Sequence, residues 1–298
     1  MTFTEKVKNE ITDEQLSENE NRYLFLGYIY ANANFENNKI FITLENINTA
    51  KKLFRTIKYC YFITPKITVR YQKKFKVQRL FILEVVDKNN TIETELNNLN
   101  LIDDDNKKSF LKGIFLATGS VNNPNKNSYH LELNFQDEKK CKYILDFLKN
   151  TGFNFKYLKR NKSFMLYLKS GEQISDFLKI LDVVKELFYF EDIRIYRDHK
   201  NMVNRLNNCE QANLEKSMET GNKQLKIINF LIDNDYFDLL DEKTREVANF
   251  RKKYPEESYN QFANIMSEKL NKSITKSYVN HHLRKINEFY LKINNKEL

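Results

Sequence analysis

Apolar residues follow two different periods along the first two hundred residues, and the same pattern occurs twice. Segments 25–45 and 111–133 each begin as an apolar helix, pass through a short polar turn and continue as an alternating strand. The apolar strand positions in the two copies are Ile40, Ile42, Leu44, Tyr129, Leu131 and Leu133. Because self-similarity at this distance fixes an architecture, we expect two copies of one folding unit.

Each copy continues in the same way, with a helix followed by two strands joined at a basic turn. The helices are expected at about 48–60 and 137–149, and the hairpins at 66–85 and 153–169. Helices packed on one curved antiparallel sheet define an α+β unit, and the predicted element order is α-β-β-α-β-β-α. The two copies cover about residues 18–100 and 106–190.

A pair of small residues lies in the helix that opens each copy. Gly27 and Ala31 are four positions apart, as are Gly113 and Ala117, so each pair occupies one helix face. Ordinary close packing also uses small residues. Their recurrence at matching positions nevertheless predicts that the two helices pack against each other as a pseudo-twofold pair.

Strand patterns stop near residue 197, and helical spacing replaces them. The Asn-rich stretch 196–221 is predicted to be a partly helical linker, and residues 222–298 an all-helical domain. Helices are expected at 223–234, 241–253, 258–270 and 274–293. Between the last two, Asn271 tolerates left-handed geometry and Ser273 is expected to cap the final helix. A helix, a tight turn and a second helix predict a helix-turn-helix.

The last predicted helix has one apolar and one polar face. Its apolar positions are Val279, Leu283, Ile286, Tyr290 and Ile293. From Lys269 to Lys292 there are six Lys or Arg residues and a single acid, Glu288. A solvated surface would be the ordinary explanation, but Arg, Lys, Asn and Ser after a helix-turn are suited to base edges and phosphates. The predicted DNA contacts are Lys272, Thr275, Lys276, Ser277, Asn280, His281, Arg284 and Lys285.

Composition narrows the class of protein without deciding its function. The 298 residues carry a net charge of +9, which is compatible with a polyanionic partner but also with translation of an AT-rich genome. Three distant cysteines without a C-x-x-C pair, and His281 and His282 pointing about 100° apart, predict neither a disulfide nor a metal site. The polar N-terminus and short apolar windows predict a soluble, cytoplasmic protein without a signal peptide, and DNA binding would make it nucleoid-associated.

Residues 18–190 resemble the paired motifs of the LAGLIDADG homing-endonuclease fold. The resemblance implies a saddle in which the two motif helices pack together and end in acids that bind catalytic metals. By position, those acids fall on Asn32 and Thr118, which supply no negative charge. Because two-metal hydrolysis needs carboxylates, we expect a nuclease fold without nuclease activity. The acidic run 103–105 precedes the second motif helix, where capping is the expected role.

Three strings resemble the WhiA family, which was first described as sporulation regulators. They are FLKGIFLATGSVNNP (110–124), NRLNNCEQAN (204–213) and SITKSYVNHHLRKI (273–286). The resemblance implies a degenerate LAGLIDADG-like domain, here residues 1–195, joined to a C-terminal helix-turn-helix. It also implies a transcription regulator of cell division or chromosome-related genes. Family members commonly have Gly at position 278, where this chain has Tyr278, and Arg at position 282, where it has His282. Loss of that Arg is expected to weaken phosphate contact or to alter sequence preference.

The resulting hypothesis is sequence-specific binding to double-stranded DNA without a cofactor. The saddle is expected to add backbone contacts through its basic hairpin, with candidates Arg70, Lys73, Lys74, Lys76 and Arg79. In the alternative hypothesis only the helix-turn-helix touches DNA, and the N-terminal domain binds a protein or small effector. An active endonuclease would need acids at positions 32 and 118, and RNA binding would use the aromatic residues among the basic strands.

Overall fold

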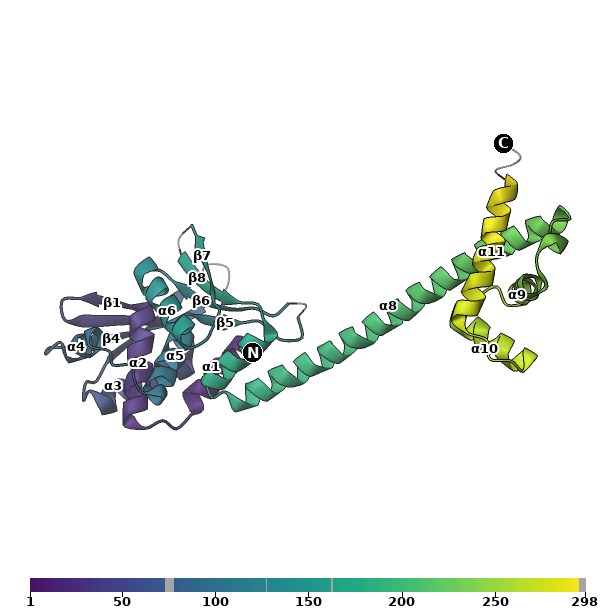
Figure 1. The fold of residues 1–298 in the computed structure, drawn as a ribbon. Helices are drawn as coiled ribbons and strands as arrows, with labels where there is room; N and C mark the ends of the chain where they lie inside the picture. The colour runs from purple at the N-terminus through teal and green to yellow at the C-terminus, as the bar shows by residue number, and fades with distance from the viewer. Residues whose placement is uncertain (73–77, 127, 162, 295–298) are drawn as a thin grey trace. The chain divides into compact units, whose positions relative to one another are not determined.

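The computed structural model describes residues 1–72, 78–126, 128–161 and 163–294, and the chain divides into two compact units. Unit 1 is Met1–Arg197 and unit 2 is Asp198–Leu298. Figure 1 shows the mixed α/β character of the first and the helical character of the second. In the described part of the chain, no helix is both long and apolar enough to cross a membrane.

Unit 1 begins with the helix α1 (Phe3–Asp13), and two repeats of seven elements follow. The first repeat consists of α2 (Glu18–Asn32), β1 (Ala33–Glu36), β2 (Lys39–Leu44), α3 (Ile47–Cys60), β3 (Lys66–Gln72), β4 (Gln78–Val86) and α4 (Thr91–Asn97). The second consists of α5 (Asp104–Thr118), β5 (Gly119–Val121), β6 (Leu131–Phe135), α6 (Glu138–Asn150), β7 (Lys156–Arg160), β8 (Ser163–Leu168) and α7 (Gly171–Ile180). The predicted α+β class and the duplicated α-β-β-α-β-β-α order are therefore confirmed.

Each repeat forms its own four-stranded antiparallel sheet. The strand orders are β1-β2-β4-β3 and β5-β6-β8-β7, so the two sheets have the same topology. The segments interpreted as polar turns after the opening helices contain the short strands β1 and β5, because the chain turns directly from helix end into sheet. Alternate residues of β2 and β6 are buried beneath the helices, as period-two patterning predicts.

The opening helices α2 and α5 have well-defined N-terminal caps. Ser17 and Glu20 form a reciprocal capping box before α2. The Asp103 carboxylate accepts a hydrogen bond from the Asn106 N–H at 3.1 Å, which confirms the capping role expected for this acid. Asp104 pairs instead with Lys107 at 2.7 Å.

The helices α2 and α5 cross at their glycines. A Cβ atom on Gly27 would lie 2.1 Å from the Phe110 carbonyl oxygen, and one on Gly113 would lie 2.0 Å from the Leu24 carbonyl oxygen. These distances are far inside van der Waals contact, so only glycine permits this approach. Ala31 and Ala117, one turn further on, are half-buried and pack against the same core. The crossing brings the C-terminal ends of both helices to one region of unit 1.

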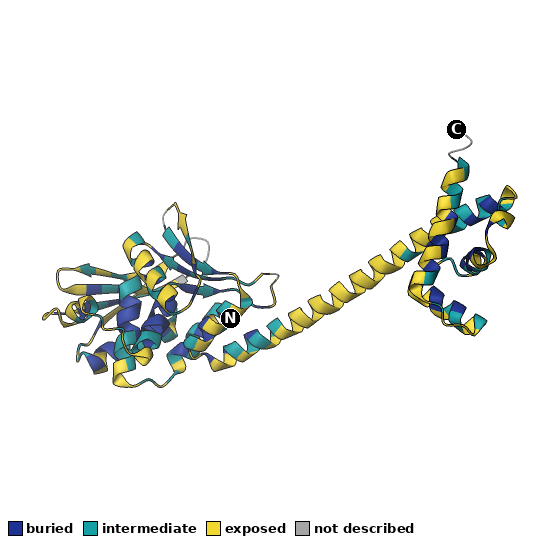
Figure 2. Cartoon of the chain, in the orientation of Figure 1, coloured by how far each residue is buried: buried dark blue, intermediate teal, exposed yellow. Residues whose placement is uncertain are grey.

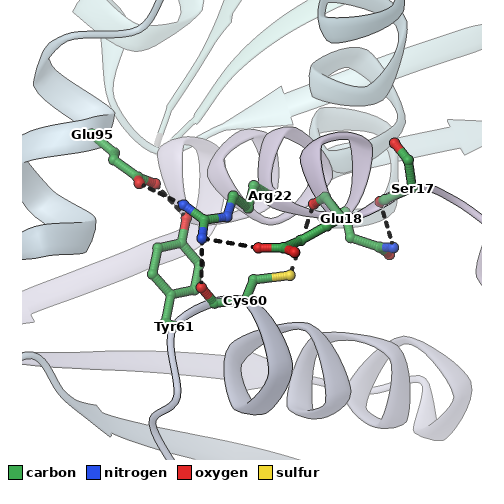
Figure 3. Close-up of polar contacts among 7 residues, drawn as sticks. Ser17, Glu18, Arg22, Cys60, Tyr61 and Glu95 are labelled. Atoms are coloured by element: carbon green, nitrogen blue, oxygen red, sulfur yellow. Dashed lines mark hydrogen bonds and ion pairs between the residues drawn. The ribbon is translucent and has the colours of Figure 1, made fainter.

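Hydrogen bonds and ion pairs hold other helices to this pair, and the hydrophobic pattern does not predict them. Arg22 of α2 donates to Glu18, to Glu95 of α4 and to the Cys60 carbonyl, while the Tyr61 hydroxyl donates to Glu95 at 2.7 Å (Figure 3). In α5 a buried lysine forms a second tie. Lys112, with a side chain only 2% exposed, contacts the carboxylates of Glu14 and Asp182 at 2.7 and 2.9 Å.

One continuous helix, α8 (Val184–Asp233), passes from unit 1 into unit 2. The stretch 196–221, expected to be only partly helical, lies entirely within it, and residues 198–216 are exposed on every face (Figure 2). The sequence suggested a break because this stretch has few apolar anchors. Its residues nevertheless include no proline and no glycine before Gly221.

Unit 2 packs the end of α8 against a short 3₁₀ turn, η1 (Phe237–Leu239), and three helices. These are α9 (Glu242–Lys253), α10 (Tyr259–Leu270) and α11 (Lys276–Asn294). Arg251 is fully buried and stands among acceptors, donating to Gln224 at 2.9 Å and to the Glu257 carbonyl at 2.6 Å. It ties α8 to the loop before α10, where Gly221 meets the Pro255 carbonyl.

Candidate nucleic-acid interface

The helices α10 and α11 with the turn between them form the predicted helix-turn-helix. Asn271 ends α10 with φ of 48°, which confirms the left-handed geometry expected there. The expected cap at Ser273 is wrong. Thr275 directly precedes α11, and its hydroxyl accepts a hydrogen bond from the Tyr278 N–H at 3.2 Å. The Ser267 hydroxyl fixes the turn by accepting from the Ile274 N–H at 3.0 Å.

The apolar face of α11 packs onto the rest of unit 2 as its spacing predicts. Val279, Leu283 and Ile286 are buried, and Tyr290 and Ile293 are half-buried. The eight residues predicted to contact DNA are all exposed: Lys272, Thr275, Lys276, Ser277, Asn280, His281, Arg284 and Lys285. Lys276, Asn280 and Arg284, four positions apart, form one row along the helix. Hydrogen-bond donors are therefore presented outward from a firmly packed helix.

Two of these side chains already have intramolecular partners. The Arg284 Nε atom lies 3.1 Å from a Glu288 carboxylate oxygen. The Lys285 ammonium lies 2.9 Å from the Asp241 carboxylate, which also caps α9 through Thr244. The hydrogen bond from Lys285 is the main reason that the pKa of Asp241 falls well below its usual range. Lys285 thus has a structural role in joining α11 to α9.

Position 282, where family members commonly have Arg, holds a buried histidine. Its side chain is buried, 6% exposed, with Nδ1 2.8 Å from the Thr244 hydroxyl and its ring 4.4 Å from that of Tyr278. Burial lowers the pKa of His282. The His282 side chain therefore faces the core of unit 2 and does not contact phosphate itself, and the weaker phosphate contact or altered sequence preference expected from the absent Arg stays a prediction. Its neighbour His281 remains exposed.

In unit 1 the ends of the two motif helices carry neutral side chains. Asn32 and Thr118 are the last residues of α2 and α5, and both line one cleft of about 1290 Å³. The Asn32 amide donates to the Thr43 carbonyl at 3.4 Å, and the Thr118 hydroxyl donates to the Ile114 carbonyl at 2.8 Å. Neither position supplies a carboxylate for a divalent cation.

The basic hairpin of the first repeat does not present its two described arginines on one face. Arg70 pairs in register with Leu80, whereas Arg79 pairs with Tyr71 and shares a sheet face with Phe81. The Arg79 guanidinium lies 5.9 Å from the Tyr71 ring centre. The other three hairpin candidates, Lys73, Lys74 and Lys76, lie outside the described residues.

We call the sheet faces turned away from the helices the open faces. The described charged residues on them are Glu36, Lys39, Lys66, Arg70, Glu84, Glu132, Lys156 and Arg160. Lys39 pairs with Glu84 at 2.8 Å, and Arg160 lies 3.9 Å from Glu132. Carboxylates therefore neutralise part of the positive charge on both open faces.

Comparison with known proteins covers both units. Residues 31–102 match the WhiA N-terminal LAGLIDADG-like domain, 107–200 the WhiA LAGLIDADG-like domain and 203–290 the WhiA C-terminal HTH domain. Two relatives named "Probable cell division protein WhiA" come from Staphylococcus haemolyticus (strain JCSC1435) and Staphylococcus aureus (strain JH9). They are 35% and 34% identical over 313 residues, covering 100% of this chain and 99% of each relative.

A solved structure extends the similarity to the fold. The crystal structure of full-length DUF199/WhiA from Thermatoga maritima is similar with a TM-score of 0.60 and 25% identity, covering 98% of this chain and 99% of that one. A duplicated fold on a crossed helix pair, without the motif-end carboxylates, followed by a helix-turn-helix, defines a degenerate LAGLIDADG-like protein with an attached HTH domain. The chain belongs to the WhiA family.

Proposed function

We propose that the protein is a sequence-specific DNA-binding transcription regulator that reads its site with α11. The observation that carries this proposal is the exposed row of Lys276, Asn280 and Arg284 on the second helix of a helix-turn-helix. Asn and Arg can form paired hydrogen bonds with adenine and guanine in the major groove. Lys276, near the N-terminus of the helix, is placed to neutralise a phosphate.

The proposed regulator does not cleave DNA. Metal-dependent phosphodiester hydrolysis requires carboxylates that hold cations against the scissile phosphate, and Asn32 and Thr118 offer only neutral groups. The names of the staphylococcal relatives support a role in cell division. We therefore place its target sites at genes of cell division or chromosome maintenance, and its site of action at the nucleoid.

In the favoured mechanism the helix-turn-helix supplies the energetically dominant contacts. Pairs such as Lys39 with Glu84 partly neutralise the open faces, which supports a smaller contribution of unit 1 to DNA binding. The same observation favours the alternative in which unit 1 binds an effector and only unit 2 touches DNA. The contribution of Arg70 to DNA affinity distinguishes these two mechanisms, because only the first uses contacts from unit 1.

The proposal is tested by incubating the full chain with sheared genomic DNA and Mg²⁺, then sequencing the bound fragments. The expected result is enrichment of intact fragments that share a motif near promoters. A variant with Asn280→Ala and Arg284→Ala should lose that enrichment while retaining its fold by circular dichroism. Uniform recovery of all fragments would contradict sequence-specific regulation, and new shared fragment ends would contradict the absence of nuclease activity.

A further inference from the structure

The cleft at the ends of α2 and α5 is polar. Besides Asn32 and Thr118, its lining includes the amides of Asn9, Asn48 and Asn134. Amides and hydroxyls of this kind both donate and accept hydrogen bonds. The cleft is larger than the volume of a typical small-molecule site, so a metabolite fits within it.

Two polar atoms in the lining are buried without a partner. The side chain of Thr49 is 2% exposed, and its hydroxyl forms no hydrogen bond with any described residue. The carbonyl oxygen of the Asn134 side chain is likewise buried and unpaired among the described residues, although its amide nitrogen donates to Glu132. Unpaired buried polar atoms cost free energy, and rotation of either side chain toward the cleft would let a bound molecule pair with it.

A lysine from the N-terminal helix also lines the cleft. Lys8 of α1 is half-buried, and among the described residues it has no ion-pair partner within 4.0 Å. Its ammonium instead lies 6.0 Å from the Phe115 ring centre. Burial lowers the pKa of Lys8 to about 8, and the charge of Glu45 offsets only part of that effect. An unpaired, partly desolvated ammonium attracts an anionic group.

We propose that this cleft binds a small phosphorylated, hydroxyl-rich molecule, a sugar phosphate or nucleoside phosphate, with Lys8 contacting the phosphate and Thr49 and Asn134 contacting hydroxyls. The phosphate of a small molecule suits the site better than a DNA backbone does. Glu5 and Glu45 also line the cleft, and a duplex would bring further phosphates against these carboxylates. The proposal goes beyond DNA binding by unit 2 and does not depend on it.

The test uses the full chain without DNA, so that its failure is separate from failure of the proposed regulator. Ribose 5-phosphate, adenosine monophosphate, inorganic phosphate, ribose and adenosine are titrated by calorimetry and thermal melting. At least one phosphorylated sugar or nucleoside should raise the Tm, and its unphosphorylated counterpart should bind at least about tenfold more weakly.

Three variants locate the site. Lys8→Met should weaken binding of the phosphorylated probe about tenfold or more, and Thr49→Val should weaken its binding several-fold. Lys51→Met, an exposed lysine of α3 outside the cleft, should leave binding unchanged. Because removal of an unpaired buried charge favours folding, Lys8→Met should also raise the Tm of the free protein, which separates a ligand-binding role from a structural one.

Three outcomes would overturn the proposal. One is the absence of any Tm increase with the phosphorylated probes at millimolar concentration. A second is equal binding by wild type and Lys8→Met, or by the phosphorylated and unphosphorylated probes. The third is weaker binding of a duplex by Lys8→Met without binding of any free phosphorylated probe, which would assign the cleft to DNA.

Discussion

The outward face of α11 and the open faces of the unit 1 sheets differ in how their charges are used. On α11, Lys276 and Asn280 lie opposite the buried apolar face, while Arg284 pairs with Glu288 of the same helix and Lys285 with Asp241. On the open faces, Glu84 and Glu132 stand beside Lys39 and Arg160. The net charge of +9 does not distinguish these regions, because only the local arrangement decides whether a polyanion meets cations or ion pairs.

The comparison teaches that the two units differ in what their local arrangement of side chains offers. Unit 1 keeps the crossed helix pair of a nuclease-like fold, although its motif ends are Asn32 and Thr118. Unit 2 keeps exposed hydrogen-bond donors on a packed helix. We therefore expect perturbations of unit 1 to change stability and ligand binding, and perturbations of α11 to change DNA recognition.

The largest expected effect concerns the helix crossing in unit 1. Gly113→Ala should destabilise unit 1 by about 3 kcal/mol or more, because the new Cβ would lie 2.0 Å from the Leu24 carbonyl oxygen and the backbones must separate. Denaturant unfolding measures the change. Gly152→Ala is the matched control, since its Cβ would meet nothing within 4 Å and only its φ of 90° is strained. Equal losses for both variants would contradict the packing explanation.

The next effect contrasts an unpaired cation of unit 1 with a paired cation of unit 2. Lys8→Met should stabilise the free protein by up to about 3 kcal/mol near pH 7, because the pKa of Lys8 is lowered from 10.5 to about 8. As the pH rises from 8 to 10.5, folded wild type loses the proton before the unfolded chain does. The unfolding free energy of the wild type therefore rises toward that of the variant, and the difference between them disappears.

Lys285→Met should change stability in the opposite direction. It removes an ion pair with Asp241 in which both side chains are about half exposed, so it should destabilise unit 2 by at most about 1 kcal/mol. Unfolding free energies of both variants, measured from pH 6 to 10.5, test the contrast. A stability loss in Lys8→Met at pH 7 would show that its ammonium is satisfied in the free protein.

An effect of intermediate size, on DNA binding and not on stability, is expected at the recognition helix. Asn280→Ala and Arg284→Ala should each weaken binding to a selected site by about 1–3 kcal/mol, because each side chain can form paired hydrogen bonds with a base. Fluorescence anisotropy with the selected duplex and a scrambled duplex measures the loss. If both duplexes lose affinity equally, these residues contact phosphate and do not specify the sequence.

The smallest effect is expected on the open face of unit 1. Arg70→Ala should change DNA affinity by less than about 0.5 kcal/mol and leave the slope of log affinity against log salt nearly constant. Arg79→Ala, on the opposite face of the same hairpin, is the matched comparison. If the slope becomes shallower by about one unit for Arg70→Ala alone, Arg70 contacts a phosphate on the open face. Unit 1 would then contribute more to DNA binding than expected.

Much of the fold was predictable because its signals are local. Period-two alternation at Ile40, Ile42 and Leu44 marks a half-buried strand, and the three- and four-residue spacing from Val279 to Ile293 marks the buried face of α11. The weakest prediction concerned residues 196–221, where an exposed helix has no apolar face to reveal it. Helix continuity there depends on local propensity and on anchoring at both ends.

The sequence by itself determined the duplication, the neutral motif ends at Asn32 and Thr118, and the polar residues available on the last helix. Only the tertiary structure decided which of those groups are free. It directs His282 into the core, joins Lys285 to Asp241, and separates Arg70 from Arg79 across a sheet. It also brings Lys8 and Thr49 to the cleft at the helix ends. The reason is physical: periodicity records how a residue relates to its own element, whereas burial and pairing depend on elements distant in the chain.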